Sequence, residues 1–538
     1  MLGGEKLGKD SFLRGAFILG LAGIMVNVLG AFFRIPLGNI IGSEGMGYYQ
    51  TSFPIYILLV TISASGFPTA ISKVVSEKLA LEDSKGAYKV FKVSFIALII
   101  TGIVSFIILF FGASFIVNNI IKSPKAYYSM LAISPALLFI PIMSAFRGYF
   151  QGRQEMSPTA VSQIMEQLGR VGLGLYLAFI LLSRGTEYAA AGASFGGTAG
   201  AIFGTLYIGF IYLKNKNSIK DEIENSKNFK EESTSEIIKK LLSIAIPITI
   251  GTSILPIMNV VDASMVVRRL QSIGFSYEQS NSLFGQLTGM AGTLINFPQV
   301  LTMSIAMSLV PVISHFHTIK DIDSLKHNTK LGIRTSILIG LPASFGLASL
   351  STPIIKLLYP KEPSSVGEIL LYLSMSVILL GLIQSTTAIL QGIEKANIPV
   401  INIAIGLVFK IAINYTLVGV SYFNVKGAAL GNIGAYIVIV ILNFYHIKKI
   451  LNIKFEFTHY IAKPLLSSLI MSIIVVTSYK LSLSLFGNSM SCLVSIGIGT
   501  LVYGASILLT GGISEGEILI MPKGQKIAAF LKKYKILR

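Results

Sequence analysis

Long apolar stretches alternate with short polar segments along the whole chain. A helix that crosses a bilayer needs ~20 predominantly apolar residues, and it satisfies its own backbone hydrogen bonds inside lipid. The pattern therefore predicts an all-α integral membrane protein with about 14 transmembrane helices. The predicted spans are centred roughly on residues 24, 58, 100, 138, 170, 200, 254, 297, 342, 379, 409, 437, 470 and 498.

The chain also contains an internal repeat. Gln151-Gly152 and Gln391-Gly392 each precede a span that begins near a proline, and a Gly-Ala-x-x-Gly segment opens the next span at Gly192 and at Gly427. Each copy holds six spans, an even number, so both copies enter the membrane in the same sense. We expect two six-helix lobes related by a pseudo-twofold axis along the membrane normal, followed by two extra C-terminal helices.

Domain boundaries follow from this plan. The N-terminal lobe is expected at residues 1–213 and the C-terminal lobe at residues 237–450. Residues 214–236 hold five lysines and six acids, so we expect a solvated and flexible cytoplasmic linker there. Two additional transmembrane helices are expected at residues 451–511 and a basic cytoplasmic tail at residues 512–538.

Composition and charge support the membrane class. Charged residues make up 13% of the chain, about half the fraction of soluble proteins. The net charge of +19 could indicate nucleic-acid binding, but 32 of the 44 Lys and Arg fall on one predicted side, including those of a loop near residues 147–153. The positive-inside rule then places both termini in the cytoplasm, in a multi-pass protein of the cytoplasmic membrane. The basic excess is explained by topology and by attraction to anionic lipid headgroups, not by nucleic acid.

Each half carries one positive charge near the centre of a predicted span. Arg170 follows Gln151 by nineteen residues, and Lys410 follows Gln391 by the same spacing. A charge at the bilayer centre costs ~2.5–3.5 kcal/mol on insertion scales, so such residues face a protein interior or a watery cavity. The matched pair predicts a central cavity that binds an anion.

Acidic residues inside spans are rare. Glu166 lies one helical turn before Arg170, so the two can pair. The pair is either a structural link or a switch, in which Arg170 binds an anion once Glu166 releases it or becomes protonated. Lys410 has no acid within a helical turn.

Asp262 lies inside a later span, with Arg268 and Arg269 at the outer end of that span. A buried carboxylate can bind a proton or sodium ion, and the alternative is a structural ion pair with one of the two arginines. Arg34 ends the first span, where it either lines the mouth of a cavity or extends to the membrane interface. These four residues complete the set of candidates for binding, coupling or gating.

Motifs of catalysis are absent from the sequence. It has no phosphate-binding glycine loop and no His-Glu-x-x-His pattern, and its five histidines lie in or near predicted loops. A single cysteine, Cys492, excludes an internal disulfide framework. The sequence therefore predicts neither an enzyme nor a metal or cofactor site.

Several segments resemble a known family, and the resemblance extends over essentially the whole chain. With the six-plus-six-plus-two plan, they are similar to the multidrug/oligosaccharidyl-lipid/polysaccharide (MOP) exporter superfamily. The branch is that of the stage V sporulation protein B and lipid II flippase-like polysaccharide biosynthesis proteins. The segments are Phe146–Gly152, Asp262 with Arg268-Arg269-Leu270, Phe284–Ala291, Asn296-Phe-Pro298, Ser308–Pro311 and Ile313-Ser314.

The resemblance implies export of an undecaprenyl-pyrophosphate-linked cell-wall sugar by two lobes that alternate access, with the extra helices forming a groove for the lipid tail. Arg34 matches the cavity arginine of the family. Two departures from lipid II flippases of the well-known Gram-negative type matter, because Tyr48-Tyr49 stands where those proteins have an acid, and about Thr293 stands where they have an arginine. We therefore expect Arg170 and Lys410 to supply the missing positive charge.

The leading prediction is a flippase for a lipid II-like precursor. A cation-coupled multidrug exporter of the same superfamily is the first alternative, although cationic drugs favour acids over arginine and lysine in a cavity. A non-transporting membrane scaffold of wall or spore assembly is the second, although a scaffold gains little from buried charges. The expected partners are a lipid-linked oligosaccharide, the bilayer and a coupling cation, H+ or Na+.

Overall fold

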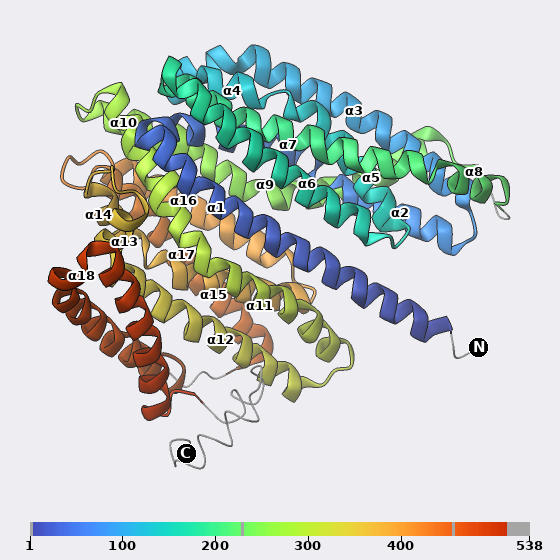
Figure 1. The fold of residues 1–538 in the computed structure, drawn as a ribbon. Coiled ribbons are helices and arrows are strands. Elements are labelled where there is room, and N and C mark those ends of the chain that lie inside the picture. The colour runs from blue at the N-terminus through green and yellow to red at the C-terminus, as the bar shows by residue number, and fades with distance from the viewer. Residues whose placement is uncertain (1–3, 227–230, 454–457, 514–538) are drawn as a thin grey trace. The chain divides into compact units, whose positions relative to one another are not determined.

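The computed structural model describes residues 4–226, 231–453 and 458–513, without the side chains of residues 4–17, 27, 458 and 459. Within these ranges the chain forms helices and their connections, and no strand (Figure 1). The predicted basic tail at residues 512–538 lies outside the described residues except for its first two.

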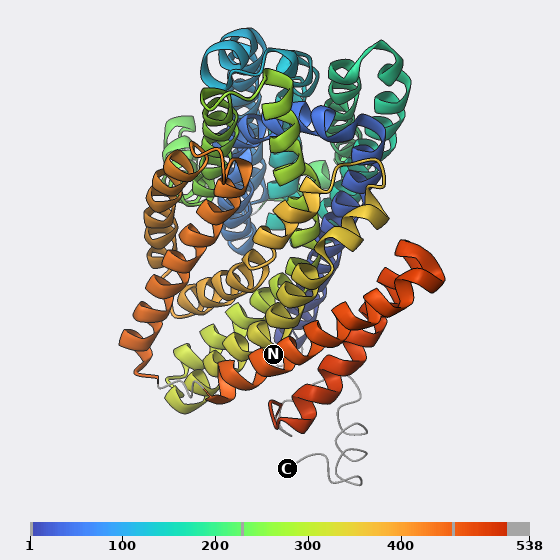
Figure 2. The ribbon, with the colours of Figure 1, turned by 90° about the vertical axis from the view of Figure 1, so that its left-hand side faces the viewer.

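The described residues contain the 14 predicted spans. Twelve helical stretches are long and apolar enough to cross a membrane. Two of these stretches, Ile18–Ala80 and Tyr460–Leu509, contain two spans each, because the helix within them bends at Gly42 and at Gly487. Both glycines have a φ of 66°, a conformation that costs glycine little. Figure 2 shows the two limbs of the last stretch, in red, folded back beside each other.

Internal contacts divide the chain into two compact units, Met1–Gly289 and Met290–Arg538. The lobe boundaries expected from the sequence stay a prediction. The helices of the first unit are α1 (Gly4–Val60), α2 (Phe67–Ala80), α3 (Ser84–Phe115), α4 (Tyr127–Ile133), α5 (Ala136–Gly152), α6 (Met156–Leu181), α7 (Thr186–Lys214), α8 (Lys216–Glu224), α9 (Thr234–Ser272) and α10 (Tyr277–Phe284), with the short segments η1 (Thr61–Ser65), η2 (Ile116–Ile121), η3 (Pro124–Ala126) and η4 (Leu182–Arg184).

Segment η5 (Gly285–Ala291) crosses the boundary between the units. The helices of the second unit are α11 (Gly292–Thr318), α12 (Ile322–Ser349), α13 (Ser351–Leu358), α14 (Ser365–Leu373), α15 (Ser376–Gly392), α16 (Asn397–Leu417), α17 (Val425–Leu451) and α18 (Lys463–Leu509), with η6 (Thr458–Ala462) before α18.

Glycines bring α6 and α7 of the first unit into close contact. A Cβ on Gly200 would lie 2.3 Å from the carbonyl oxygen of Glu166, and one on Gly196 would lie 2.5 Å from the carbonyl oxygen of Arg170. Small residues allow such close approach of helices in membranes. The contact fixes the height at which Glu166 and Arg170 stand in the bundle.

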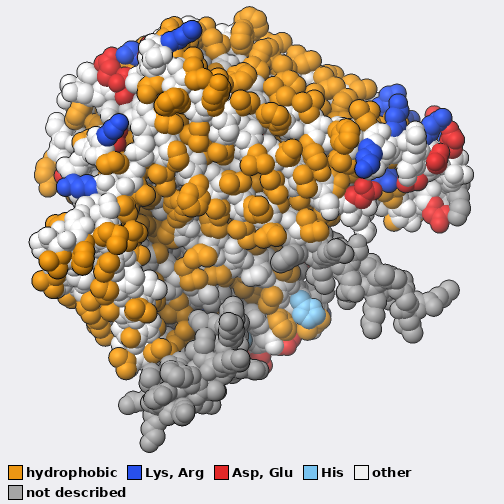
Figure 3. All heavy atoms as spheres, viewed as in Figure 1, with side chains coloured by type: hydrophobic (Ala, Val, Ile, Leu, Met, Phe, Trp, Pro, Cys, Tyr) orange, Lys and Arg blue, Asp and Glu red, His pale blue; other side chains and the backbone are white. Residues whose placement is uncertain are grey.

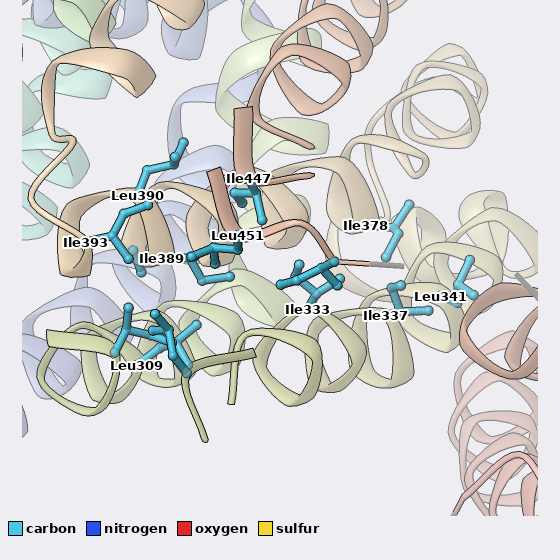
Figure 4. Packing of buried hydrophobic residues seen from close by; sticks show 14 residues of the cluster. Leu309, Ile333, Ile337, Leu341, Ile378, Ile389, Leu390, Ile393, Ile447 and Leu451 are labelled. Atoms are coloured by element: carbon cyan, nitrogen blue, oxygen red, sulfur yellow. The ribbon is translucent and has the colours of Figure 1, made fainter. Parts of the chain in front are cut away.

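The core of the second unit is a cluster of aliphatic side chains from α11, α12, α15 and α17 (Figure 4). Ile389, Ile393 and Ile447 are almost completely buried in it. A smaller cluster lies where the limbs of α18 meet, and it contains the fully buried Cys492. The cysteine is thus a small core residue, as its apolar surroundings in the sequence suggest.

The internal repeat is visible in the backbone. The turns after Gln151-Gly152 and Gln391-Gly392 each place a non-glycine residue in the left-handed region, Gln154 with a φ of 61° and Glu394 with a φ of 62°. The next residue closes the preceding helix in the same way. Glu155 N donates to Phe150 O and Lys395 N donates to Leu390 O, at 2.9 Å in each case.

The expectation of a flexible linker is wrong for Lys216–Glu224, which forms helix α8. Arg153, in the turn between α5 and α6, binds Glu222 of this helix through two parallel hydrogen bonds of 2.9 and 3.0 Å. On the face shown in Figure 3, charged side chains gather around α8 and at the far end of the same unit, and hydrophobic side chains cover the surface between them. This distribution fits a membrane-embedded surface.

Candidate functional site

Glu166 and Arg170 form the pair that their spacing predicts. Arg170 Nη2 donates to Glu166 Oε1 at 3.2 Å, within the same turn of α6. The side chains of Arg170 and Glu166 are 19% and 18% exposed, so the pair is largely enclosed by protein. An enclosed charge of this kind needs a partner.

A second arginine, missed by sequence reasoning, completes the site. The sequence-based prediction placed Arg147 in a loop, but α5 continues through it to Gly152. Arg147 Nη2 donates to Glu166 Oε2 at 3.1 Å, and Arg147 Nε donates to Ser162 Oγ at 2.9 Å. Glu166 therefore lies between two guanidinium groups from two helices. The available signal was that apolar and aromatic residues continue on both sides of Arg147, from Ala145 to Phe150, before Gln151-Gly152.

The three charged side chains line a cavity of about 250 Å³. Arg170 Nε and Gln163 Oε1 are buried and have no hydrogen-bond partner in the described residues. Leaving a buried polar group unsatisfied costs ~1–3 kcal/mol, so the cavity favours a polar occupant. With Glu166 ionised, the cluster has a net charge of +1. The cavity is lined by Gly23, Val26, Arg147, Gln163, Glu166, Gln167 and Arg170.

Arg34 is not among the residues that line this cavity. It lies on α1 two helical turns beyond Val26, which does line it, and its side chain is partly buried. Gly30 and Phe33, between them, face α6 at Gln167 and Gly174. Arg34 thus lies further along α1 than the residues that line the cavity, and it is not one of them.

Lys410 belongs to the second unit, where it lies on α16 and is only 2% exposed. It shares one face of this helix with the buried side chains of Asn402 and Asn414. Asn402 Nδ2 donates to Asn443 Oδ1 at 2.8 Å, and Asn443 Nδ2 donates to Thr386 Oγ1 at 3.0 Å. These bonds form a buried amide network that joins α15, α16 and α17, two helical turns from Lys410 on the same face of α16.

The remaining candidates lie on α9, in the first unit. Asp262 is 7% exposed and thus keeps the burial that a cation-binding carboxylate requires. Arg268 is exposed, whereas Arg269 is half-buried and donates from Nη1 to Ser272 Oγ at 3.4 Å. The structure places Asp262 in the interior and Arg268 at the surface.

The apolar helices define a multi-pass membrane protein, and its relatives place it among transporters and not among enzymes. The family model described as "Polysaccharide biosynthesis protein" matches residues 12–317, and the MatE model matches residues 288–416. The chain belongs to the polysaccharide biosynthesis protein family, in the stage V sporulation protein B and MurJ-like branch of the MOP superfamily.

Individual relatives agree with this placement. The chain is similar to stage V sporulation protein B of Bacillus subtilis (strain 168), with 30% identity over 84% of this chain and 87% of that protein. It is equally similar to the lipid II flippase MurJ of the same organism, with 30% identity over 82% and 83% of the two chains. Its fold is similar to a solved lipid II flippase MurJ in an inward closed conformation, with a TM-score of 0.68, 19% identity and coverage of 91% and 98%.

Proposed function

We propose that this protein is a flippase that moves an undecaprenyl-pyrophosphate-linked, lipid II-like precursor across the cytoplasmic membrane by alternating access. The proposal is carried by one observation, the pair of guanidinium groups that face a cavity within an apolar helical bundle. A lipid-linked pyrophosphate brings two negative charges, and arginine binds phosphate oxygens in a fixed, forked geometry. The relative named as a lipid II flippase supports this choice of cargo.

In this proposal, Arg34, Arg170 and Lys410 are the candidate substrate ligands. Arg170 is the strongest of the three, because it lines the cavity. Glu166 and Asp262 are the candidate coupling groups, for H+ or Na+, and Arg268 and Arg269 are candidates for gating. The two proposed lobes, residues 1–213 and 237–450, would move around the cargo, with both termini in the cytoplasm.

The test is translocation of lipid II by the purified full chain in proteoliposomes, followed with a leaflet-specific probe. Membrane potential and pH gradient are varied separately, so that the coupling ion is identified in the same experiment. Wild-type protein should translocate lipid II, and Arg170→Met should not. Lys220→Met, on the exposed face of α8, serves as the matched control. Failure of the wild-type protein, or wild-type transport by Arg170→Met, would contradict the proposal.

The second candidate is a cation-coupled multidrug exporter, which the MatE match over residues 288–416 favours. The net positive cavity of the first unit disfavours a cationic drug, because like charges repel in an enclosed site. Drug efflux that disappears in Asp262→Asn, in a protein that does not move lipid II, would establish this alternative. A scaffold role would instead require that variants without any buried charge still support growth of a flippase-depleted strain.

A further inference from the structure

In the cavity of the first unit, a carboxylate occupies the position between two arginines that an anion would take. We infer that Glu166 is an exchangeable counter-ion: the pyrophosphate group of the cargo displaces it from Arg147 and Arg170, and Glu166 takes up one proton from water as it leaves. The proton returns to water when the cargo departs and the carboxylate pairs again. The inference rests on the proposed function and specifies how the site is regulated.

The geometry of the cluster suits exchange. Each arginine holds Glu166 by one hydrogen bond, of 3.1 Å from Arg147 and 3.2 Å from Arg170. Arg153 of the same unit holds Glu222 by two bonds, of 2.9 and 3.0 Å. Forked contacts of the second kind are the stronger ones. Glu166 is thus held by single contacts from two arginines and lacks the forked contact that Glu222 makes with Arg153.

Donors remain available for a larger anion. Arg170 Nε is buried without a partner, and neither Arg147 nor Arg170 donates a hydrogen bond from Nη1 to any residue that the structure describes. A carboxylate has two oxygens, whereas a pyrophosphate has several that can reach both guanidinium groups at once. The cavity of about 250 Å³ beside the arginines gives such a group room to enter.

Charge balance explains why a proton would accompany the cargo. Two guanidinium groups and an ionised Glu166 give a net charge of +1, so a pyrophosphate diester with two negative charges would leave the site at −1. An uncompensated charge enclosed in an apolar bundle is costly. Protonation of Glu166 brings the occupied site to zero, and the empty site then regains its internal ion pairs when the proton is released.

Few other ionisable groups face this cluster. Arg147 faces Glu166 from α5, Arg170 from its own helix, and Tyr56 of α1 lies within electrostatic reach of both Glu166 and Arg170. Tyr49 of α1 reaches Arg170 in the same way. Helix α7 presents glycines at this height. Tyrosines are neutral near pH 7, so Glu166 is the acidic group among these residues.

The experiment uses the full chain in nanodiscs and P,P′-dimethyl pyrophosphate, a diester whose two charges do not titrate between pH 5 and pH 9. Binding is measured by calorimetry and proton uptake by a pH-sensitive dye in weak buffer. Wild-type protein should take up about one proton per bound diester, and its affinity should fall as the pH rises. Glu166→Gln should bind at least ~10-fold more tightly at pH 8, because a nearby like charge opposes binding in the wild type. This variant should take up no proton.

Two variants serve as controls. Glu155→Gln, in the adjacent turn and paired with Arg153, should match the wild type in affinity and proton uptake. Arg147→Gln, the residue that sequence reasoning missed, should lose at least ~10-fold in affinity, since it removes a charge-assisted contact. Thermal melting of each variant verifies that it is folded before binding is compared.

The inference is overturned if folded Glu166→Gln binds the diester like the wild type, or if proton uptake persists in that variant. This failure is distinct from failure of the proposed function. A wild-type protein that binds the diester with proton uptake but does not move lipid II would refute the flippase and keep the exchangeable counter-ion. A protein that moves lipid II without proton uptake at Glu166 would refute the exchangeable counter-ion and keep the flippase.

Discussion

The segments at residues 151–170 and 391–410 share a backbone plan and differ in chemistry. Both begin with Gln-Gly, both turn through a left-handed residue, and both place a basic residue nineteen positions after the glutamine. In the first, Glu166 pairs with two arginines beside a cavity. In the second, amide and hydroxyl groups bind one another, and Lys410 is buried on the same face of α16.

The turns of the two segments also differ in chemistry, with charged contacts in the first and apolar packing in the second. Arg153 follows the first Gln-Gly and is held by Glu155 and Glu222 through charge-assisted hydrogen bonds. Ile393 follows the second and lies 1% exposed in the aliphatic cluster of its unit. The repeat thus preserves where helices begin, turn and approach one another, while the contacts that hold them have become ionic in one copy and apolar or amide-based in the other.

The largest test of this difference replaces each basic residue by methionine, which removes the charge and keeps an unbranched, flexible side chain. Arg170→Met should lower the rate of lipid II translocation at least ~100-fold, equivalent to about 2.7 kcal/mol of barrier, because the cavity loses a ligand and Glu166 loses a partner. Lys410→Met should lower it less than ~10-fold, because Lys410 is only 2% exposed and is therefore hardly accessible to a cargo.

Rates in proteoliposomes, corrected for the amount of folded protein, measure both effects. Equal losses in the two variants would mean that Lys410 also meets the cargo, as the sequence alone predicts. Arg170 and Lys410 would then be equivalent anion ligands, and the two segments would not differ in function.

The sequence predicted the helices of this fold far better than it predicted the site. Apolar length alone identified 14 spans, because lipid leaves the backbone few alternatives. The four-residue spacing of Glu166 and Arg170 likewise predicted their ion pair. Spacing along one helix could not predict the contact of Arg147 with Glu166, because Arg147 lies on another helix. Its place at the polar end of an apolar span also looks, in the sequence, like the start of a loop. Burial of Lys410 depends on how α16 packs on α17, which no spacing within α16 reports.

A smaller effect is expected from the amide network of the second unit. Asn443 accepts one hydrogen bond from Asn402 and donates another to Thr386. Side-chain hydrogen bonds between membrane helices contribute ~0.6 kcal/mol on average, so Asn443→Leu should lower the free energy of unfolding by about 1 kcal/mol. Lipid II translocation should stay near the wild-type rate, because these groups hold helices together and do not bind cargo.

Unfolding in detergent and translocation in proteoliposomes measure the two quantities on the same preparation. Asn402→Leu should reproduce the loss of stability, and the double variant should lose less than the sum, since both remove the same bond. A collapse of transport in a stable Asn443→Leu protein would show that the second unit also carries functional polarity.

The smallest expected effect concerns the turn at Arg153, which ionic contacts stabilise in the first copy of the repeat and not in the second. The Arg153 guanidinium lowers the pKa of Glu222 through its hydrogen bonds, and the same bonds raise the pKa of Arg153. A carboxyl whose pKa is lower in the folded state contributes stability above its unfolded pKa of ~4.3, and this contribution is lost as the pH falls through the folded value. Docking of α8 should therefore be complete at pH 7 and should weaken in acid below about pH 4.

Glu222 is 39% exposed, so solvent screens the pair and its contribution should stay below ~1 kcal/mol. Hydrogen exchange of the α8 amides reports this local opening directly. Glu222→Gln at pH 7 should accelerate exchange in α8 as acid does in the wild type, and it should abolish the acid response. The turn at Ile393 is the internal control, because its apolar packing involves no titrating group and its exchange should not follow Glu222. If the two turns open together in acid, the contact between Arg153 and Glu222 does not stabilise the first turn, and the same forces stabilise both turns.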